Sequence, residues 1–189
     1  DISSAEEVTQ LLAHTSNLRG VVHAAGVLDD GMLMHQSPKR FLKVAGPKVS
    51  GAWNLHIQTK DHPLDFFVLF SSVASIIGSP GQSNYAAANA FMDGLAHHRK
   101  HQGLVATSIN WGPWSDVGMA ASDVVLQRLM KDGWQPMNAS QGCDFIGHLL
   151  KVCKLPQAAV LPVDWRQFAA SIPGAVNWNI LSHLVSKEQ

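Results

Sequence analysis

The sequence contains very little cysteine. It has two, Cys143 and Cys153, in 189 residues, too few for the disulfide framework that stabilises a small secreted domain. Both fall on or near one expected helix, about three helical turns apart, so a disulfide between them is not expected. We therefore expect two buried, reduced thiols in a cytoplasmic protein.

Long apolar runs and an excess of charge of either sign are also missing. The longest apolar runs are strand-sized, far below the ~20 residues that span a bilayer. The first residues do not have the basic, apolar and small-residue pattern of a secretory signal. Fourteen basic residues balance fourteen acidic ones, so no global field favours nucleic acid. We expect neither a membrane nor a nucleic acid as a partner.

The sequence also lacks the usual pattern of a metal site. His97 and His101 share one face of an expected helix, but no third ligand or acidic partner stands at a suitable spacing. Cationic side chains are favourable near the C-terminus of a helix, which explains these histidines without a metal. We therefore expect no metal ion.

What the sequence does contain is an alternation of short apolar segments with helical segments. The apolar segments are strand-sized, and 189 residues can bury a substantial core as one domain. Such alternation predicts an α/β fold with a parallel sheet and flanking helices. The expected strands lie near residues 20–25, 65–70, 105–109 and 158–162.

Polar residues follow two of these strands. Ser71 and Ser72 end the segment at 65–70, and the turn Asn110-Trp111-Gly112-Pro113-Trp114 follows the segment at 105–109. A helix starting near Ser83 carries Tyr85 and Asn89 one turn apart. In an open parallel sheet, ligands bind at the carboxyl ends of the strands. We therefore expect Ser72, Tyr85 and the NWGPW turn to meet in one crevice.

These residues also have ordinary structural explanations. A tyrosine on a helix is more often a packing residue with a hydrated hydroxyl group than a catalytic one. Lys48 lies just after Gly46-Pro47, where a helix should kink or restart, and most lysines are solvated surface residues. Spacing alone does not distinguish Lys48 from the other lysines that flank this helix.

A resemblance to a known family favours a functional role for these residues over the ordinary structural explanations. The chain resembles the short-chain dehydrogenase/reductase superfamily and, within it, the ketoreductase domain of modular polyketide synthases. Ordinary members of the superfamily carry Tyr-x-x-x-Lys, whereas Asn89 takes the place of that Lys here. In the ketoreductases the Lys lies on the preceding helix in a K-V-x-G-A-x-x-L pattern, which matches KVSGAWNL from Lys48. HAAG at 23–26 and LPVDW at 161–165 extend the match over nearly the whole chain.

The resemblance implies a Rossmann-like fold and an NADPH-dependent reduction of a β-ketoacyl thioester held on an acyl carrier protein. Tyr85 would donate a proton to the developing alkoxide, and Lys48 would favour the phenolate and hold the nicotinamide ribose. Ser72 would bond to the carbonyl oxygen, and Asn89 would anchor Lys48 or a water. The residues implied to contact the cofactor are Asp1, Ile2, Ala24, Ala25, Gly26, Gly112, Pro113 and Trp114.

The resemblance also implies a stereochemical class and a division of the chain. Leu28-Asp29-Asp30, together with the absence of Trp from residues 76–84, is typical of ketoreductases that give D-configured β-hydroxy products. Without the resemblance, this tripeptide is more simply a polar loop. Residues 1–168 would form the catalytic part, with a lid at about 115–138, and residues 169–189 a tail or linker. The residues expected near the substrate are Leu28, Asp29, Asp30, Pro80, Gln82 and Met119.

Asp1-Ile2 matches the end of the third strand of the family, so we expect a fold truncated at its N-terminus. The 189 residues contain no G-x-G-x-x-G turn to hold a pyrophosphate. The strand at 20–25 would be an unpaired edge, which we expect another segment of the reductase, a second copy or a partner to cover. The isolated chain would then be weakly active or inactive. A non-catalytic scaffold or interaction half stays open as the alternative, and an epimerase ranks below both.

Overall fold

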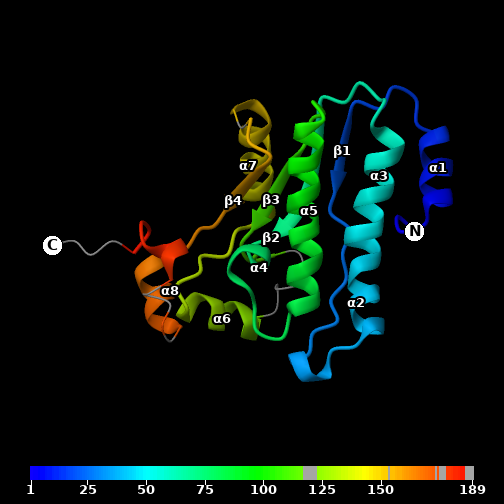
Figure 1. The fold of residues 1–189 in the computed structure, drawn as a ribbon. Helices are drawn as coiled ribbons and strands as arrows, with labels where there is room; N and C mark the ends of the chain where they lie inside the picture. The colour runs from blue at the N-terminus through cyan, green and yellow to red at the C-terminus, as the bar shows by residue number, and fades with distance from the viewer. Residues whose placement is uncertain (117–122, 153, 173, 175–177, 186–189) are drawn as a thin grey trace. The chain divides into compact units, whose positions relative to one another are not determined.

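The structure is a computed structural model that describes residues 1–116, 123–152, 154–172, 174 and 178–185. The chain divides into two compact units (Figure 1). The first unit comprises Asp1–Trp111 and Val152–Ala159, and the second comprises Gly112–Lys151 and Val160–Gln189.

A four-stranded sheet forms the centre of the fold, with the strand order β1-β2-β3-β4. Its strands are β1 (Gly20–His23), β2 (Phe66–Ser72), β3 (Thr107–Trp111) and β4 (Gln157–Val160). β1 and β3 both run parallel to β2, with Val22 opposite Val68 and Ile109 opposite Phe70. This confirms the predicted α/β fold with a parallel sheet and places β1 at one edge. β1 ends at His23, so the expected strand at 20–25 is two residues too long at its C-terminal end.

The helices of the first unit are α1 (Ala5–Ala13), α2 (Pro38–Ala45), the π-helical turn η2 (Gly46–Ser50), α3 (Gly51–Thr59), α4 (Ala74–Ile77) and α5 (Ser83–His101). Of these, α1, α3 and α5 run side by side (Figure 1). The Ser4 hydroxyl caps α1 by accepting from the Glu7 N–H at 3.3 Å. Ser37 caps α2 in the same way, and Pro38 occupies its first turn, where a missing N–H is tolerated.

The core of the first unit fills the space between these helices and the sheet. α5 contributes Met92, Leu95 and Ala96, all buried, and the small alanine lets the helix approach the strands closely. β2 contributes Phe67 and Leu69 to the same cluster. A second, smaller cluster comprises Val44, Ala74, Tyr85 and Ala88. Tyr85 is therefore held by packing as well as by its polar contacts.

The second unit has its own packing. It contains α6 (Asp123–Lys131), α7 (Ala139–Val152, whose last residue belongs to the first unit), α8 (Trp165–Ser171) and the 3-10 turn η4 (Asn179–Leu181). The rings of Trp134 and Phe168 lie 5.4 Å apart, edge to face, a favourable aromatic geometry. Trp114 packs so closely on Gly142 that a Cβ there would lie 2.0 Å from its ring.

Of three residues with a stated expectation, Cys143, Cys153 and Met119, only the first lies in the described part of the chain. Cys143 is exposed with a free thiol, so its predicted burial is wrong, because α7 directs that position to solvent. Cys153 lies outside the described residues, as does Met119.

None of the helices in the described ranges combines the length and the apolar character needed to cross a membrane.

Candidate active site

The carboxyl end of β2 and the start of α5 bring two of the predicted residues together. Ser72 is the last residue of β2, and its hydroxyl accepts from the Ala74 N–H at 3.2 Å. Tyr85 lies in the first turn of α5 and is 9% exposed. A hydrogen bond joins the Ser72 and Tyr85 side chains. The expected meeting of these two residues is therefore present in the structure.

Lys48 is directed inward by an unusual piece of backbone. Gly46-Pro47 does not simply kink the helix. Residues Gly46–Ser50 instead form a π-helical turn between α2 and α3, a feature that is often found at functional sites. The Lys48 side chain is 3% exposed, and its Nζ donates to the Phe70 carbonyl at 3.0 Å. Nζ also lies 5.2 Å from the centroid of the Tyr85 ring, so Lys48 is not a surface lysine.

Asn89 completes the group of four predicted catalytic residues. It lies one turn after Tyr85 on α5 and is fully buried. Its Nδ2 donates to the Tyr85 carbonyl at 2.7 Å, while its Oδ1 has no hydrogen-bond partner among the described residues. A buried acceptor of this kind is costly to leave unpaired, so it can hold a water or a ligand hydroxyl.

Burial sets the electrostatics of this group. It lowers the pKa of Lys48 from 10.5 to about 8, against the charge of Asp93, which raises it. Burial also raises the pKa of Tyr85, although the hydrogen bonds from Ser72 and Asn89 lower it. We expected the Lys48 ammonium to lower the pKa of Tyr85. The opposite direction is found because burial raises the pKa of the phenol, and the nearby charge of Asp30 raises it as well.

Sequence reasoning missed two titratable residues beside this group. His23 ends β1 and is 3% exposed, and burial followed by the charge of Lys48 lowers its pKa to about 4. Asp93 is buried on α5, where its carboxylate accepts from Ser75, Ser108 and Asn110. The signal was available, because Asp93 lies four residues after Asn89 and therefore on the same helix face.

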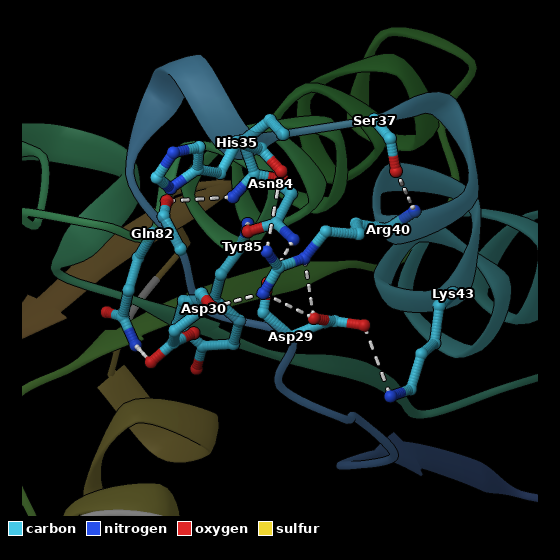
Figure 2. A network of polar contacts seen from close by, with 11 residues as sticks. Asp29, Asp30, His35, Ser37, Arg40, Lys43, Gln82, Asn84 and Tyr85 are labelled. Carbon is cyan, nitrogen blue, oxygen red and sulfur yellow. Dashed lines mark hydrogen bonds and ion pairs between the residues drawn. The ribbon is translucent and has the colours of Figure 1, made fainter.

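Residues Leu28-Asp29-Asp30, called the LDD loop below, are held against two helices (Figure 2). The Asp29 carboxylate lies 2.7 Å from the Arg40 guanidinium and 3.2 Å from Lys43 Nζ. Hydrogen bonds to Arg40 and then to Lys43 lower the pKa of Asp29. Asn84, in the first turn of α5, donates to the Asp29 carbonyl at 2.8 Å. The loop is thus anchored on both sides.

The other residues predicted near the substrate are distributed around this loop. Gln82 Nε2 donates to the Asp30 carboxylate at 2.9 Å, and Asp30 lies close enough to Tyr85 to raise its pKa. Leu28 packs on the cluster that contains Tyr85. Pro80 is exposed in the segment before α5. The structure therefore brings Leu28, Asp30 and Gln82 toward the tyrosine.

The predicted cofactor residues fall into three places. Ala24 and Ala25 are exposed after β1, and a Cβ at Gly26 would lie 2.9 Å from Lys48 Cε. The Asp1 carboxylate accepts from the Ser3 N–H and hydroxyl, while Ile2 packs on the core of the first unit. The residues Gly112, Pro113 and Trp114 belong to the second unit.

The first of these places fits a nicotinamide nucleotide. Two small exposed residues end β1 beside a glycine that leaves room for the Lys48 side chain. A ribose hydroxyl could bond to the Lys48 amine. The contribution of Asp1, Ile2, Gly112, Pro113 and Trp114 to cofactor binding stays a prediction. In the described part of the chain, no group of three or more His, Cys, Asp or Glu side chains is placed to hold a metal ion.

A comparison with protein families identifies this arrangement. The family model described as the KR domain matches residues 1–116. This chain belongs to the ketoreductase (KR) domain family of polyketide synthases. The expected resemblance is therefore confirmed, and with it the membership of the short-chain dehydrogenase/reductase superfamily.

Curated relatives are polyketide synthases that are much longer than this chain. Polyketide synthase GfsA of Streptomyces halstedii is 44% identical over 187 residues, which are 97% of this chain and 2% of that protein. The phenolphthiocerol synthesis polyketide synthase Pks15/1 of Mycobacterium marinum is 45% identical over 159 residues, 80% of this chain and 8% of the relative. The KR chain thus spans a small part of these relatives.

Solved ketoreductases share the fold. An A-type ketoreductase from a modular polyketide synthase matches with a TM-score of 0.86 and 38% identity. The match covers 90% of this chain and 37% of the ketoreductase chain. A C2-type ketoreductase matches with a TM-score of 0.82 and 30% identity, and this match covers 93% of this chain and 38% of the ketoreductase chain. Because ketoreductases of both named types match about equally well, the fold alone does not assign this chain to either type.

Proposed function

We propose that this chain carries the catalytic residues of an NADPH-dependent β-ketoacyl reductase that acts on a thioester held by an acyl carrier protein. The observation that carries the proposal is the grouping of Lys48, Ser72 and Asn89 around the buried Tyr85. The other domains of a polyketide synthase would supply the acyl chain and receive the product.

In this proposal the bound nicotinamide supplies a hydride to the carbonyl carbon of the substrate. The Ser72 hydroxyl bonds to the carbonyl oxygen and places it beside the Tyr85 hydroxyl. As the carbonyl π electrons move to oxygen, the Tyr85 O–H bond breaks and its proton forms the new alcohol O–H. General acid catalysis of this kind contributes about 10²–10⁴-fold to a rate.

The shifted pKa values suit these roles. The raised pKa of Tyr85 keeps the phenol protonated at neutral pH, so the acid form is the resting form. The Lys48 ammonium, with a pKa of about 8, stabilises the phenolate that remains after proton transfer. It would also hold the ribose hydroxyls. Asn89 Oδ1 is the acceptor for a water through which Tyr85 regains its proton.

The anchored LDD loop supports a D-configured product. Its contacts with α2 and α5 fix one wall beside Tyr85, so a tethered acyl chain would enter from one side only. Positioning of this kind is worth up to ~7–11 kcal/mol of a reaction barrier. We infer that the loop decides which face of the ketone is turned toward the hydride.

A non-catalytic scaffold is the second candidate. It is favoured by one observation, the lack of a G-x-G-x-x-G turn within these 189 residues, because that turn holds the pyrophosphate in this type of fold. In this case the chain would pack against other parts of the synthase and would not catalyse a reaction.

NADPH oxidation with a small β-ketothioester distinguishes the two candidates. Two polypeptides are assayed: the chain alone, and the chain joined to the N-terminal half of a ketoreductase. Each is tested as the wild type and as the Tyr85→Phe variant. The reductase proposal predicts turnover by the longer polypeptide that Tyr85→Phe reduces by at least about 10²-fold. His97→Gln, an exposed change on the same helix, should leave the rate unchanged. Absence of turnover in both polypeptides would support the scaffold.

A further inference from the structure

Asp93 is a buried carboxylate on α5 to which the proposed reaction assigns no role. It is 8% exposed. Its Oδ1 lies 2.6 Å from Ser108 Oγ, and its Oδ2 lies 2.6 Å from Ser75 Oγ and 2.9 Å from Asn110 Nδ2. Burial of a charge costs several kcal/mol unless it is paired or hydrogen-bonded. The ion pairs found within the described residues all involve other acids.

The groups that bond to Asp93 also hold the backbone of the candidate active site. Asn110 Nδ2 lies 3.3 Å from the Ser72 carbonyl and 3.1 Å from Ser71 Oγ. Ser75 Oγ lies 2.8 Å from the same Ser72 carbonyl, and Ser71 Oγ donates to the Asn89 carbonyl at 3.3 Å. One connected set of hydrogen bonds therefore leads from Asp93 to the backbone of Ser72 and Asn89.

The charge of Asp93 also acts on Lys48. Burial lowers the pKa of Lys48, and the Asp93 carboxylate is the group that raises it. The other titratable groups facing Lys48 are His23 from β1, whose own pKa is lowered partly by Lys48, and Tyr85 from α5. Neither of these supplies a negative charge while Tyr85 is protonated. The carboxylate thus opposes the loss of the Lys48 proton in a site from which water is largely excluded.

We propose that Asp93 is a positioning residue of this active site. Through Asn110 and Ser75 it fixes the strand end that carries Ser72, and its negative charge acts on the buried Lys48 amine. This inference rests on the proposed reductase function for its catalytic meaning. The link between Asp93 and Lys48 is a property of the chain itself and can be measured without turnover.

The direct test is an NMR titration of the lysine side chains in the chain, labelled at Cε and Nζ, for the wild type, Asp93→Asn and Asp93→Ser. The Lys48 resonance is assigned by its loss in Lys48→Met. Both Asp93 variants should move the Lys48 midpoint to lower pH, because the ammonium loses its stabilising charge. Ser108→Ala breaks the same network but keeps the carboxylate, so its midpoint should stay near that of the wild type. An unchanged midpoint in whichever Asp93 variant folds would overturn the inference.

A pH profile of the reductase then tests the catalytic role. In Asp93→Asn, kcat/KM should fall about three- to tenfold at pH 8 but by no more than about twofold at pH 6, since Lys48 is still protonated there. A loss of equal size at every pH would mean a purely structural role and would overturn this part of the proposal. If the wild type shows no reduction while the Lys48 midpoint still moves, the proposed function fails and the link between Asp93 and Lys48 stands.

Discussion

Lys48 illustrates how one turn of backbone can change the chemistry of a side chain. The residues around it would suit a solvated lysine on a helix surface. The π-helical turn instead directs its amine toward the Phe70 carbonyl, at 3.0 Å, and the Tyr85 ring. Burial then lowers its pKa to about 8. Such a lysine can gain or lose its proton near neutral pH, which is useful in an active site. The fold is less stable as a result, because the charged ammonium is buried.

Replacement of Lys48 by Met should stabilise the fold at pH 7 while it removes reduction. The pKa falls from 10.5 to about 8, and each unit corresponds to about 1.4 kcal/mol, so the buried ammonium costs roughly 3 kcal/mol. Loss of the bond to the Phe70 carbonyl offsets about 1 kcal/mol of this. We expect the free energy of unfolding in urea to rise by about 2 kcal/mol.

The sign of this effect can be checked with pH. Between pH 8 and 10.5 the unfolded chain binds a proton that the folded chain has released, so wild-type stability rises with pH in that window. The advantage of Lys48→Met should therefore shrink as the pH approaches 10.5. An advantage of the same size at pH 7 and pH 10 would contradict this explanation. Lys39→Met, at an exposed position, is the matched control.

The reaction itself should depend on the protonation of Lys48. The raised pKa of Tyr85 keeps the phenol protonated over the neutral range, so Lys48, with its pKa of about 8, is the group that titrates first as the pH rises. We expect kcat/KM for NADPH oxidation to be level below pH 7 and to fall by about tenfold per pH unit above pH 8. A rate that stays constant up to pH 9.5 would remove Lys48 from the mechanism.

At the scale of the elements, the sequence predicted which segments form strands and helices better than it predicted the local backbone geometry between them. Hydrophobic runs identified the strands, because that signal is local. The π-helical turn Gly46–Ser50 was missed, since Gly46-Pro47 indicates only that a regular helix is interrupted. The hydrogen bonds of Asp93 were missed as well, because they join α5 to residues brought near only by the folded sheet.

The close packing after β1 gives a test of how exactly Lys48 must be placed. A Cβ at Gly26 would lie 2.9 Å from Lys48 Cε, so Gly26→Ala should displace the amine. We expect kcat/KM to fall by about 10- to 100-fold, because small misplacements of a catalytic group are costly. In Gly94→Ala, by contrast, the new Cβ meets nothing within 4 Å, and this helix should gain about 0.5–1 kcal/mol in stability. Equal activity of the two variants would contradict the account.

The anchored LDD loop makes a prediction about the product. Arg40→Ala removes the ion pair with Asp29 and the hydrogen bonds that Arg40 donates to the Asp30 and His35 carbonyls. Partly exposed pairs contribute only about 0–1 kcal/mol to stability, so the variant should fold. We expect chiral chromatography to show a lower ratio of D to L product than for the wild type. Lys39→Ala, on the same helix, serves as the control, and an unchanged ratio in Arg40→Ala would exclude the loop from stereocontrol.

At the scale of the whole molecule, β1 is an edge of the described sheet. Val22 on this strand is 52% exposed and Leu11 on α1 is 58% exposed. An apolar edge with unpaired backbone groups favours pairing with another strand. The sequence predicted this edge from the family resemblance. What covers it depends on contacts beyond the chain, which sequence patterns do not describe.

The isolated chain should therefore self-associate through β1. We expect sedimentation velocity to show species larger than a monomer that increase with concentration. Val22→Lys should shift the distribution toward the monomer, because a charge on an edge strand opposes pairing. Val124→Lys, which changes a residue of α6 that is 80% exposed, should not do so. A wild-type chain that stays monomeric at all concentrations would contradict this prediction.

Transfer of deuterium from NADPH that carries deuterium at both positions of C4 tests the central claim most directly. The longer polypeptide that joins this chain to the N-terminal half of a ketoreductase is incubated with a β-ketothioester, and the product is analysed by mass spectrometry. The account predicts one deuterium on the β-carbon of the hydroxy product with the wild type, and a loss of at least about 10²-fold in labelled product with Tyr85→Phe. Unlabelled product, or labelled product formed equally fast by Tyr85→Phe, would contradict it.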